Sequence, residues 1–283
     1  MKLHLPTSEI FIPDGKSVPA ALSRTTHLGI GAHHDDLEFM AFHGILQCFA
    51  NEDQWFSGVT CTNGAGSSRT GPYARCSDAD LMVIRRKEQN TAAVIGEYAA
   101  MVQLDYPSKS VKSPTETELK DDLVTILNAT RPEVVYTHNP ADKHDTHIGV
   151  TISAIQAMRE LPEAQRPKQV IGCEVWRDLD WLPDDRKVIM DVSARDNLAA
   201  ALNGVFDSQI AGGKRYDLAI QGRRAANATF FDSHSTDSAS QIIFGIDLTS
   251  LITDPASDIV AFTCDLIDRF KADVRQKLTA KLG

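Results

Sequence analysis

The sequence predicts an α/β fold with a Rossmann-like layered architecture, in which helices flank a mostly parallel central sheet. Short apolar runs bounded by glycine or polar turns alternate with amphipathic segments, a pattern typical of parallel strands joined by helical crossovers. The 283 residues are enough to bury a large core. This length allows one large domain or two smaller ones; with no internal repeat and no low-complexity linker, we favour a single domain over residues 1–283.

In the first half of the chain, three predicted strands are each followed by a helix. The strands are expected at 26–32, 55–62 and 99–104, and the helices at 37–50, 77–96 and 116–128. Ser77 or Asp78 is the expected N-cap of the second helix. The polar, glycine-rich residues 63–75 are too many for an ordinary connection, which makes them a candidate active-site loop.

The second half begins with a buried strand at 134–138. Thr146 is the expected cap of a helix that starts near His147 and reaches Met158. An apolar run at 170–176 is expected to help complete the sheet. The remaining predicted elements are a strand at 187–191 and helices at 197–208, 213–227 and 257–282.

Composition limits the classes of partner. The net charge of −9, with no basic stripe, argues against nucleic-acid binding. No run of eighteen apolar residues suggests a membrane span, and residues 1–10 lack the apolar core of a secretion signal. We therefore expect a cytoplasmic protein with no membrane partner.

Histidines and aspartates gather in two segments, His33-His34-Asp35-Asp36 and residues 142–147, with His138 between them. A catalytic zinc site takes three His, Asp or Glu ligands and leaves a fourth position open to water. His33, Asp36 and His147 can supply these ligands. Asp35 would then face the water as general base, and His144 would stabilise the oxyanion or protonate the leaving group.

Both segments follow predicted strands. In open parallel sheets, ligands bind beyond the carboxyl ends of the strands. The two segments, although more than a hundred residues apart, are therefore expected to meet at one edge of the sheet.

The segment from Ala32 to Glu38 resembles the signature Ala-His-Pro-Asp-Asp-x-Glu of the PIG-L/LmbE-like zinc-dependent de-N-acetylases. Residues 62–66, Arg69 and residues 85–88 follow in the order seen in that family. The resemblance implies an LmbE-like fold in which His33, Asp36 and His147 bind zinc. It also implies Asp35 as base, His144 facing the oxyanion, and a homo-oligomer.

Two departures from the family pattern affect the site. His34 replaces the signature proline, and because a fourth protein ligand would displace the catalytic water, we interpret it as a pocket-wall or supporting residue. Thr146 replaces the usual carboxylate before His147, so Asp142 or Asp145 must orient the catalytic histidine. His138 is expected to line the site.

Other residues keep two interpretations. Glu38 either supports a ligand or the loop backbone, or it favours the start of a helix through the helix dipole. Arg69 either clamps a substrate oxygen or lies solvated in its loop. Trp176 is interpreted as a core or interface residue, although it can stack on a sugar. Arg223 and Arg224 are interpreted as structural salt-bridge partners.

The sequence hypothesis is a zinc-dependent N-deacetylase that acts on a small polar substrate, an N-acetyl amino sugar or its conjugate. Fe²⁺ or Co²⁺ can also occupy two histidines and an aspartate. One alternative is a metal hydrolase of another bond, such as a different amide, an ester or a phosphoester. Another is a sugar-binding homologue that no longer turns over.

Overall fold

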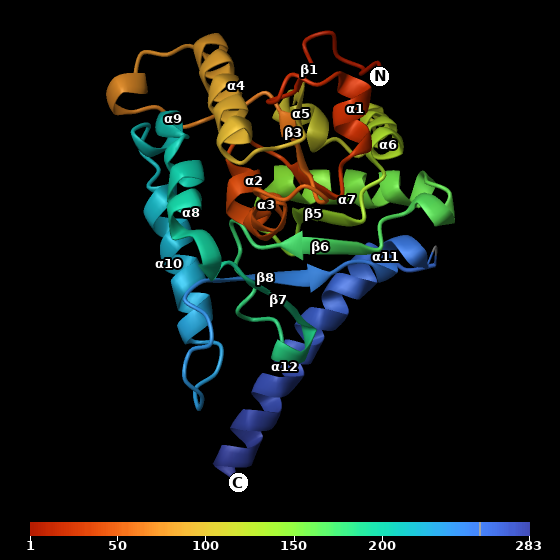
Figure 1. Cartoon of the computed structure of the whole chain (residues 1–283). Coiled ribbons are helices and arrows are strands. Elements are labelled where there is room, and N and C mark those ends of the chain that lie inside the picture. Colours follow the sequence, from red (N-terminus) through yellow and green to blue (C-terminus); the bar gives the residue numbers. More distant parts are fainter. Residues whose placement is uncertain (255) are drawn as a thin grey trace.

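The computed structural model describes residues 1–254 and 256–283, and an eight-stranded mixed sheet forms its centre (Figure 1). The strands are β1 (Glu9–Phe11), β2 (His27–Gly31), β3 (Phe56–Thr62), β4 (Ala100–Tyr106), β5 (Val134–His138), β6 (Gln169–Cys173), β7 (Lys187–Asp191) and β8 (Ile242–Asp247). Their order in the sheet is β1-β4-β3-β2-β5-β6-β8-β7. Strands β2 to β6 are parallel, whereas β1, β7 and β8 each pair in antiparallel fashion. The predicted α/β fold with a mostly parallel sheet is confirmed.

Helices cover both faces of this sheet (Figure 1). They are α1 (Val18–Ser23), α2 (Asp36–Met40), α3 (Phe42–Cys48), α4 (Asp78–Ile95), α5 (Ser108–Val111), α6 (Glu118–Thr130), α7 (Asp145–Glu160), α8 (Asp196–Gly204), α9 (Asp207–Ile210), α10 (Tyr216–Thr229), α11 (Ser250–Thr253) and α12 (Ile259–Leu282). One apolar layer includes α6, α7 and α11, and the other includes α2, α3, α4 and α8. This is the layered packing expected of crossover connections.

Strand β2 shows how the sequence positions the site. Leu28 and Ile30 are fully buried in one apolar layer, whereas Gly29 and Gly31 face the other. A Cβ atom at Gly29 would lie only 2.8 Å from Leu37 Cδ2. Glycine therefore lets α2 approach the sheet closely, and this brings Asp36 to the carboxyl end of β2.

The chain changes direction across the sheet at β2. This strand lies between β3 and β5, so the crossovers on its two sides lead toward opposite edges. Such a switch point leaves a crevice outside the carboxyl ends of the strands. Residues 32–36 follow β2 and residues 139–147 follow β5, so both segments border that crevice.

The helix predicted over 37–50 is instead two helices, α2 and α3, which meet at Ala41. Buried Arg224 explains the break, because its guanidinium donates to the backbone oxygens of Glu38 (2.8 Å) and Phe39 (3.0 Å). In a continuous helix these two carbonyls would accept hydrogen bonds from backbone N–H groups four residues later. A side chain that inserts into this series of hydrogen bonds interrupts the helix. The salt-bridge interpretation of Arg224 was wrong.

Other boundaries also differ from prediction. The helix predicted over 197–208 divides into α8 and α9, and helix α1 with strands β1 and β8 was not predicted. Strand β8 is a short apolar run, which periodicity alone cannot distinguish from a buried helical segment. Of the two expected N-caps, Ser77 is confirmed: its side chain accepts from Asp80 N–H, and the Asp80 carboxylate accepts from Ser77 N–H in return, which forms a capping box.

Helix α12 starts against the core and then extends away from the body of the molecule to the C-terminus (Figure 1). Ile259 and Phe262 pack on the apolar layer that contains Leu266, the one buried residue of this helix. Across residues 1–254 and 256–283, every helix is too short or too polar to cross a membrane.

Candidate metal centre

Three side-chain atoms form a small triangle where β2 and β5 end. His33 Nδ1 lies 3.2 Å from Asp36 Oδ2 and 3.1 Å from His147 Nε2, and the latter two atoms are 3.4 Å apart. A tetrahedral ion with bonds of about 2.0–2.1 Å separates its ligand atoms by about 3.3 Å. The triangle therefore has the size that such an ion requires, and its donors are those that zinc prefers.

His147 is held as a neutral imidazole whose Nε2 lone pair can bind a metal ion. Its Nδ1 lies 3.2 Å from Asp142 Oδ2, so the proton belongs on Nδ1 and the Nε2 lone pair faces the triangle. Burial, followed by the nearby His138, lowers the pKa of His147 to about 4. Burial would raise the pKa of Asp36, but the His147 and His138 imidazoles hold it well below its usual range. At neutral pH the triangle offers an anionic carboxylate and a neutral imidazole.

His138 lies behind the triangle. Its ring stacks on His147 with 3.8 Å between centroids, and its Nε2 lies 3.4 Å from Asp36 Oδ2. That Nε2 accepts a 2.9 Å hydrogen bond from the backbone N–H of Ala32. Because this bond uses the lone pair that an ion would need, His138 fits a supporting position better than a ligand position, although it is close enough to group with Asp36 and His147.

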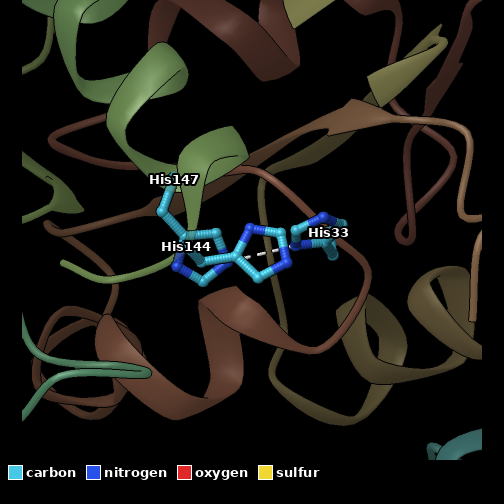
Figure 2. Close-up of side chains that lie close together, drawn as sticks. All are labelled: His33, His144 and His147. Carbon is cyan, nitrogen blue, oxygen red and sulfur yellow. Dashed lines mark hydrogen bonds between the residues drawn. The ribbon is translucent and has the colours of Figure 1, made fainter. Parts of the chain in front are cut away.

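The His144 side chain lies close to those of His33 and His147 (Figure 2). Its ring centroid is 4.9 Å from that of His33 and 4.6 Å from that of His147. His144 Nδ1 accepts from Thr146 N–H at 3.3 Å and caps α7, which leaves Nε2 as a donor. Thr146 is not the helix cap, because the imidazole that precedes it in the chain takes that role.

Asp35 lies beside the triangle in a strained conformation. Its backbone has φ 95° and ψ −28°, in a region that non-glycine residues rarely adopt. Its N–H donates to Gln89 Oε1 at 3.2 Å, and Arg85 lies 3.7 Å from its carboxylate. Burial raises the pKa of Asp35 well above that of a free aspartate, and the Arg85 charge opposes this rise.

Arg85 is a residue of the site that sequence reasoning did not identify. It is buried, donates to His34 O at 2.7 Å, and contacts both Gly64 O and the Ser67 hydroxyl. It therefore ties the turn after β2 to the glycine-rich loop. Its only signal in the sequence was its place in the family-like run 85–88.

His34 and Glu38 face away from the triangle. His34 is buried, and its Nε2 lies 3.0 Å from Gln103 Oε1 on β4. Glu38 accepts from Tyr98 OH at 2.7 Å and from Gln89 Nε2 at 2.9 Å. Since Gln89 also holds Asp35 N–H, Glu38 supports the loop backbone through one intermediate side chain.

The two acidic residues proposed to orient His144 have different surroundings. Asp142 bonds His147 and accepts from the backbone N–H groups of His144 and Trp176, so it orients the His147 ring. Asp145 is exposed on the first turn of α7. In the described residues neither carboxylate bonds the His144 ring, which instead contacts the backbone of its own helix. That prediction was wrong.

Arg69 is placed in the loop rather than at the site. Its guanidinium donates to Cys76 O at 2.9 Å and Ala65 O at 2.7 Å, and it contacts Asp78. It does not line the cavity that contains the triangle. The structure therefore assigns Arg69 to loop closure and offers nothing for the substrate-clamp interpretation.

A cavity of about 610 Å³ opens from the triangle. His33, Asp35 and Asp36 line its floor, and His144 lies at one side. None of the other described residues that line it is acidic. They are Phe39, Gly64, Gly66, Ser67, Ser68, Arg85, Ser108, Lys112, Lys143, Thr146, Val175, Trp176, Gln209, Lys214, Tyr216, Ala219, Ile220 and Arg223. Trp176 thus faces the cavity, and Arg223 is part of its wall.

Comparison with protein families gives one match. Residues 28–158 match the family model described as PIG-L, GlcNAc-PI de-N-acetylase. This part of the chain is similar to the PIG-L family. The PIG-L match includes every residue of the triangle as well as Asp35, Asp142 and His144. Trp176, Lys214 and Arg223 lie beyond it.

Solved structures share the fold of this chain. The conserved protein TT1542 from Thermus thermophilus is 18% identical, with 83% of this chain and 99% of that chain covered and a TM-score of 0.60. GalB, the 4-carboxy-2-hydroxymuconate hydratase of Pseudomonas putida, is also 18% identical, with 79% and 95% covered and a TM-score of 0.60.

A third neighbour is the N,N'-diacetylchitobiose deacetylase of Pyrococcus horikoshii. It is 18% identical, with 78% of this chain and 83% of that chain covered and a TM-score of 0.58. At such identities the likeness concerns the fold alone. A search of curated proteins found no match.

Proposed function

We propose that this protein is a metal-dependent N-deacetylase that releases acetate from a small polar substrate, an N-acetyl amino sugar or its conjugate. One observation carries the proposal: a three-atom donor triangle lies at the floor of a cavity, with the buried carboxylate of Asp35 beside it. Such a site suits hydrolysis by activated water.

His33, Asp36 and His147 would hold the ion, with zinc favoured and Fe²⁺ or Co²⁺ as alternatives. When bound, such an ion acidifies a water molecule and polarises the amide carbonyl. Asp142 and His138 would support this set, since the first fixes the tautomer of His147 and the second packs on its ring.

Asp35 would accept the proton of the attacking water. Burial strengthens it as a base by raising its pKa, while Arg85 favours the carboxylate form. His144 would donate its Nε2 proton toward the developing oxyanion or the departing amine, because the start of α7 occupies Nδ1. Burial and the neighbouring His33 lower the pKa of His144, which favours the neutral ring whose Nδ1 accepts from Thr146 N–H and whose Nε2–H can donate a hydrogen bond to the oxyanion.

The family description favours deacetylation, and the fold alone does not choose the reaction. A chitobiose deacetylase and a hydratase resemble this chain to nearly the same extent. Hydrolysis of another amide or ester bond uses the same activated water. The products therefore have to be identified, and the loss of substrate alone is not sufficient evidence.

The first experiment compares metal content and products in three proteins purified without added metal and then loaded with zinc. We expect about one zinc per chain in the parent and in His234→Ala, a control at an exposed histidine outside the site, and almost none in His147→Ala. Equal metal in His147→Ala and the parent would overturn the ligand assignment.

The same proteins are then incubated with a panel of N-acetylated amino sugars. The parent is expected to release acetate and free amine in equal amounts, and His147→Ala to release neither. A hydrated product without acetate would overturn the deacetylase proposal. The expected homo-oligomer and the absence of nucleic-acid or membrane partners stay predictions of the sequence.

A further inference from the structure

Four cations surround the outer wall of the cavity, and we name them the cationic rim: Lys112, Lys143, Lys214 and Arg223. They come from four places in the fold, namely the end of α5, the segment before α7, the segment before α10, and α10 itself. Within the described part of the chain, the only acidic residues that line the cavity are Asp35 and Asp36 on its floor. This positive opening belongs to a chain with a net charge of −9.

The rim cations are not used for ion pairs. Within residues 1–254 and 256–283, none of the four has a carboxylate oxygen within 4.0 Å. Other lysines do have such partners, as Lys120 has Glu160 and Lys187 has Asp184. Unpaired cations gathered at a concave opening attract anionic ligands and hold them.

Two of these cations are held in place by the wall. Arg223 is half-buried and donates one guanidinium nitrogen to Val175 O, while Lys214 Nζ lies 5.3 Å from the centroid of the Trp176 ring. Tyr216, Ile220 and Arg223 follow at spacings of four and three along α10, so they share the face that lines the cavity. The remaining Arg223 donors suit a carboxylate or a phosphate.

The floor and the rim are close enough for one small molecule to reach both. The His144 ring centroid is 5.9 Å from that of Trp176, and Lys214 lies over the same indole. We propose that the substrate carries an anionic oxygen group, a phosphate or a carboxylate, which binds the cationic rim while its N-acetyl group lies at the floor. This proposal rests on the proposed function for the placement of the acetyl group.

The kinetic test compares three substrates on the zinc-loaded protein at low salt: N-acetylglucosamine, its 6-phosphate, and N-acetylmuramic acid, which carries a carboxylate. We expect at least one anionic substrate to have a kcat/KM about tenfold or more above that of N-acetylglucosamine, mainly through a lower KM. The double variant Lys214→Gln/Arg223→Gln should remove most of this preference. The control Lys87→Gln, at an exposed lysine outside the cavity, should keep it.

A binding measurement separates failure of this proposal from failure of the proposed function. Calorimetry with glucosamine and glucosamine 6-phosphate needs no turnover, and we expect the phosphate to bind about tenfold more tightly to the parent than to the double variant. A preference that survives in the double variant would show that Lys214 and Arg223 do not hold the phosphate and would overturn this proposal. Acetate release without any anionic preference would retain the deacetylase and reject the rim.

A separate observation concerns α12, where six large apolar side chains are exposed: Val260, Ile267, Phe270, Val274, Leu278 and Leu282. Most of their spacings are three or four residues, so they form one apolar stripe along the helix. The exposed fraction is 59% for Leu278 and 85% for Leu282. An exposed apolar stripe of this length marks an interaction surface.

The charges on α12 identify its partner. From Asp258 to Asp268 the charged residues are all acidic, and from Arg275 to Gly283 they are all basic. A second copy of α12 in the antiparallel direction would place each acidic half against a basic half, whereas a parallel copy would oppose like charges. We infer that α12 pairs with α12 of a second copy about a two-fold axis.

Light scattering with size-exclusion chromatography tests this pairing. Val274→Lys introduces a charge into the apolar stripe, and the matched control Gln276→Lys introduces the same charge about half a turn away, outside it. We expect dimers for the parent and the control and monomers for Val274→Lys. A monomeric parent at 50 µM, or dimers that both substitutions leave intact, would overturn the inference.

Discussion

Residues 28–158 and residues 159–283 make different contributions to one cavity. The first region supplies most of the parallel strands, the donor triangle and Asp35, and it is the part that matches the PIG-L family model. The second region supplies an antiparallel sheet edge and the wall residues Trp176, Lys214 and Arg223. We therefore expect the chemistry in the first region, whereas substrate choice should draw on both, because Lys112 and Lys143 of the cationic rim lie in the first region and Lys214 and Arg223 in the second.

The largest effect should come from the first region. Asp35→Asn is expected to lower kcat by about 10²–10⁴-fold while the metal content stays unchanged, because a general base is lost and no ligand is removed. Asparagine tolerates the left-handed backbone found at this position, so the turn should persist. Kinetics and metal analysis on one preparation would check this, and a variant with half the parental kcat would remove Asp35 from the base role.

Asp142→Asn should weaken metal binding by about 10–100-fold, since Asp142 orients His147 and raises its basicity. Asp145→Asn is the matched control, because this neighbouring carboxylate is exposed. Competition with a chelator measures both affinities. Equal metal affinities for the two variants would mean that Asp142 contributes only to packing. The first region would then hold the ion without help from Asp142.

A substitution in the second region should act on binding rather than chemistry. Trp176→Ala is expected to raise KM by about tenfold and to leave kcat and metal content close to parental values, as happens when a uniform binding contact is removed. Steady-state kinetics with the best substrate from the anionic series would test this. A large fall in kcat with an unchanged KM would assign chemistry to the second region.

The first region should also determine acid sensitivity in the metal-free protein. Burial lowers the pKa of His34 well below its ordinary value, and it lowers the pKa of His43 and His147 to about 4. The unfolded chain, with an ordinary histidine pKa of about 6.5, then binds more protons between pH 6.5 and 4. Stability should therefore fall as the pH decreases through that window, by about 1.4 kcal/mol per pH unit for each such histidine.

His43→Gln tests that contribution away from the triangle. Its side chain contacts Tyr136 OH at 2.9 Å and takes no part in the metal centre. Urea unfolding of the metal-free parent and the variant from pH 7 to pH 4 should show a shallower decline for the variant. Parallel declines would show that His43 does not contribute to the acid sensitivity.

Sequence reasoning succeeded where local pattern determines structure. The parallel strands followed from their short apolar runs, and the N-cap at Ser77 from a short polar residue placed before a helical pattern. The convergence of His33 and His147 followed from the rule about strand ends. Each of these depends on residues that are neighbours in the chain or on a topological regularity.

The features that sequence reasoning missed depend on contacts between distant segments. Arg224 breaks the helix at Ala41 from 183 positions away, and Arg85 reaches the turn after β2 from α4. An imidazole cap at His144 is also unusual, since N-caps are normally short polar residues. The cationic rim combines four segments, and no single stretch of sequence contains it.

The triangle has a consequence for the stability of the whole chain. His33 and Asp36 follow β2, whereas His147 lies in the first turn of α7 beyond β5, so an ion held by all three would cross-link two separate crossover units. An ion that binds only the folded chain adds about 2.7 kcal/mol of stability at a hundred times its Kd. The melting temperature of this protein would then rise with the free concentration of the ion, and a chelator would act as a mild denaturant.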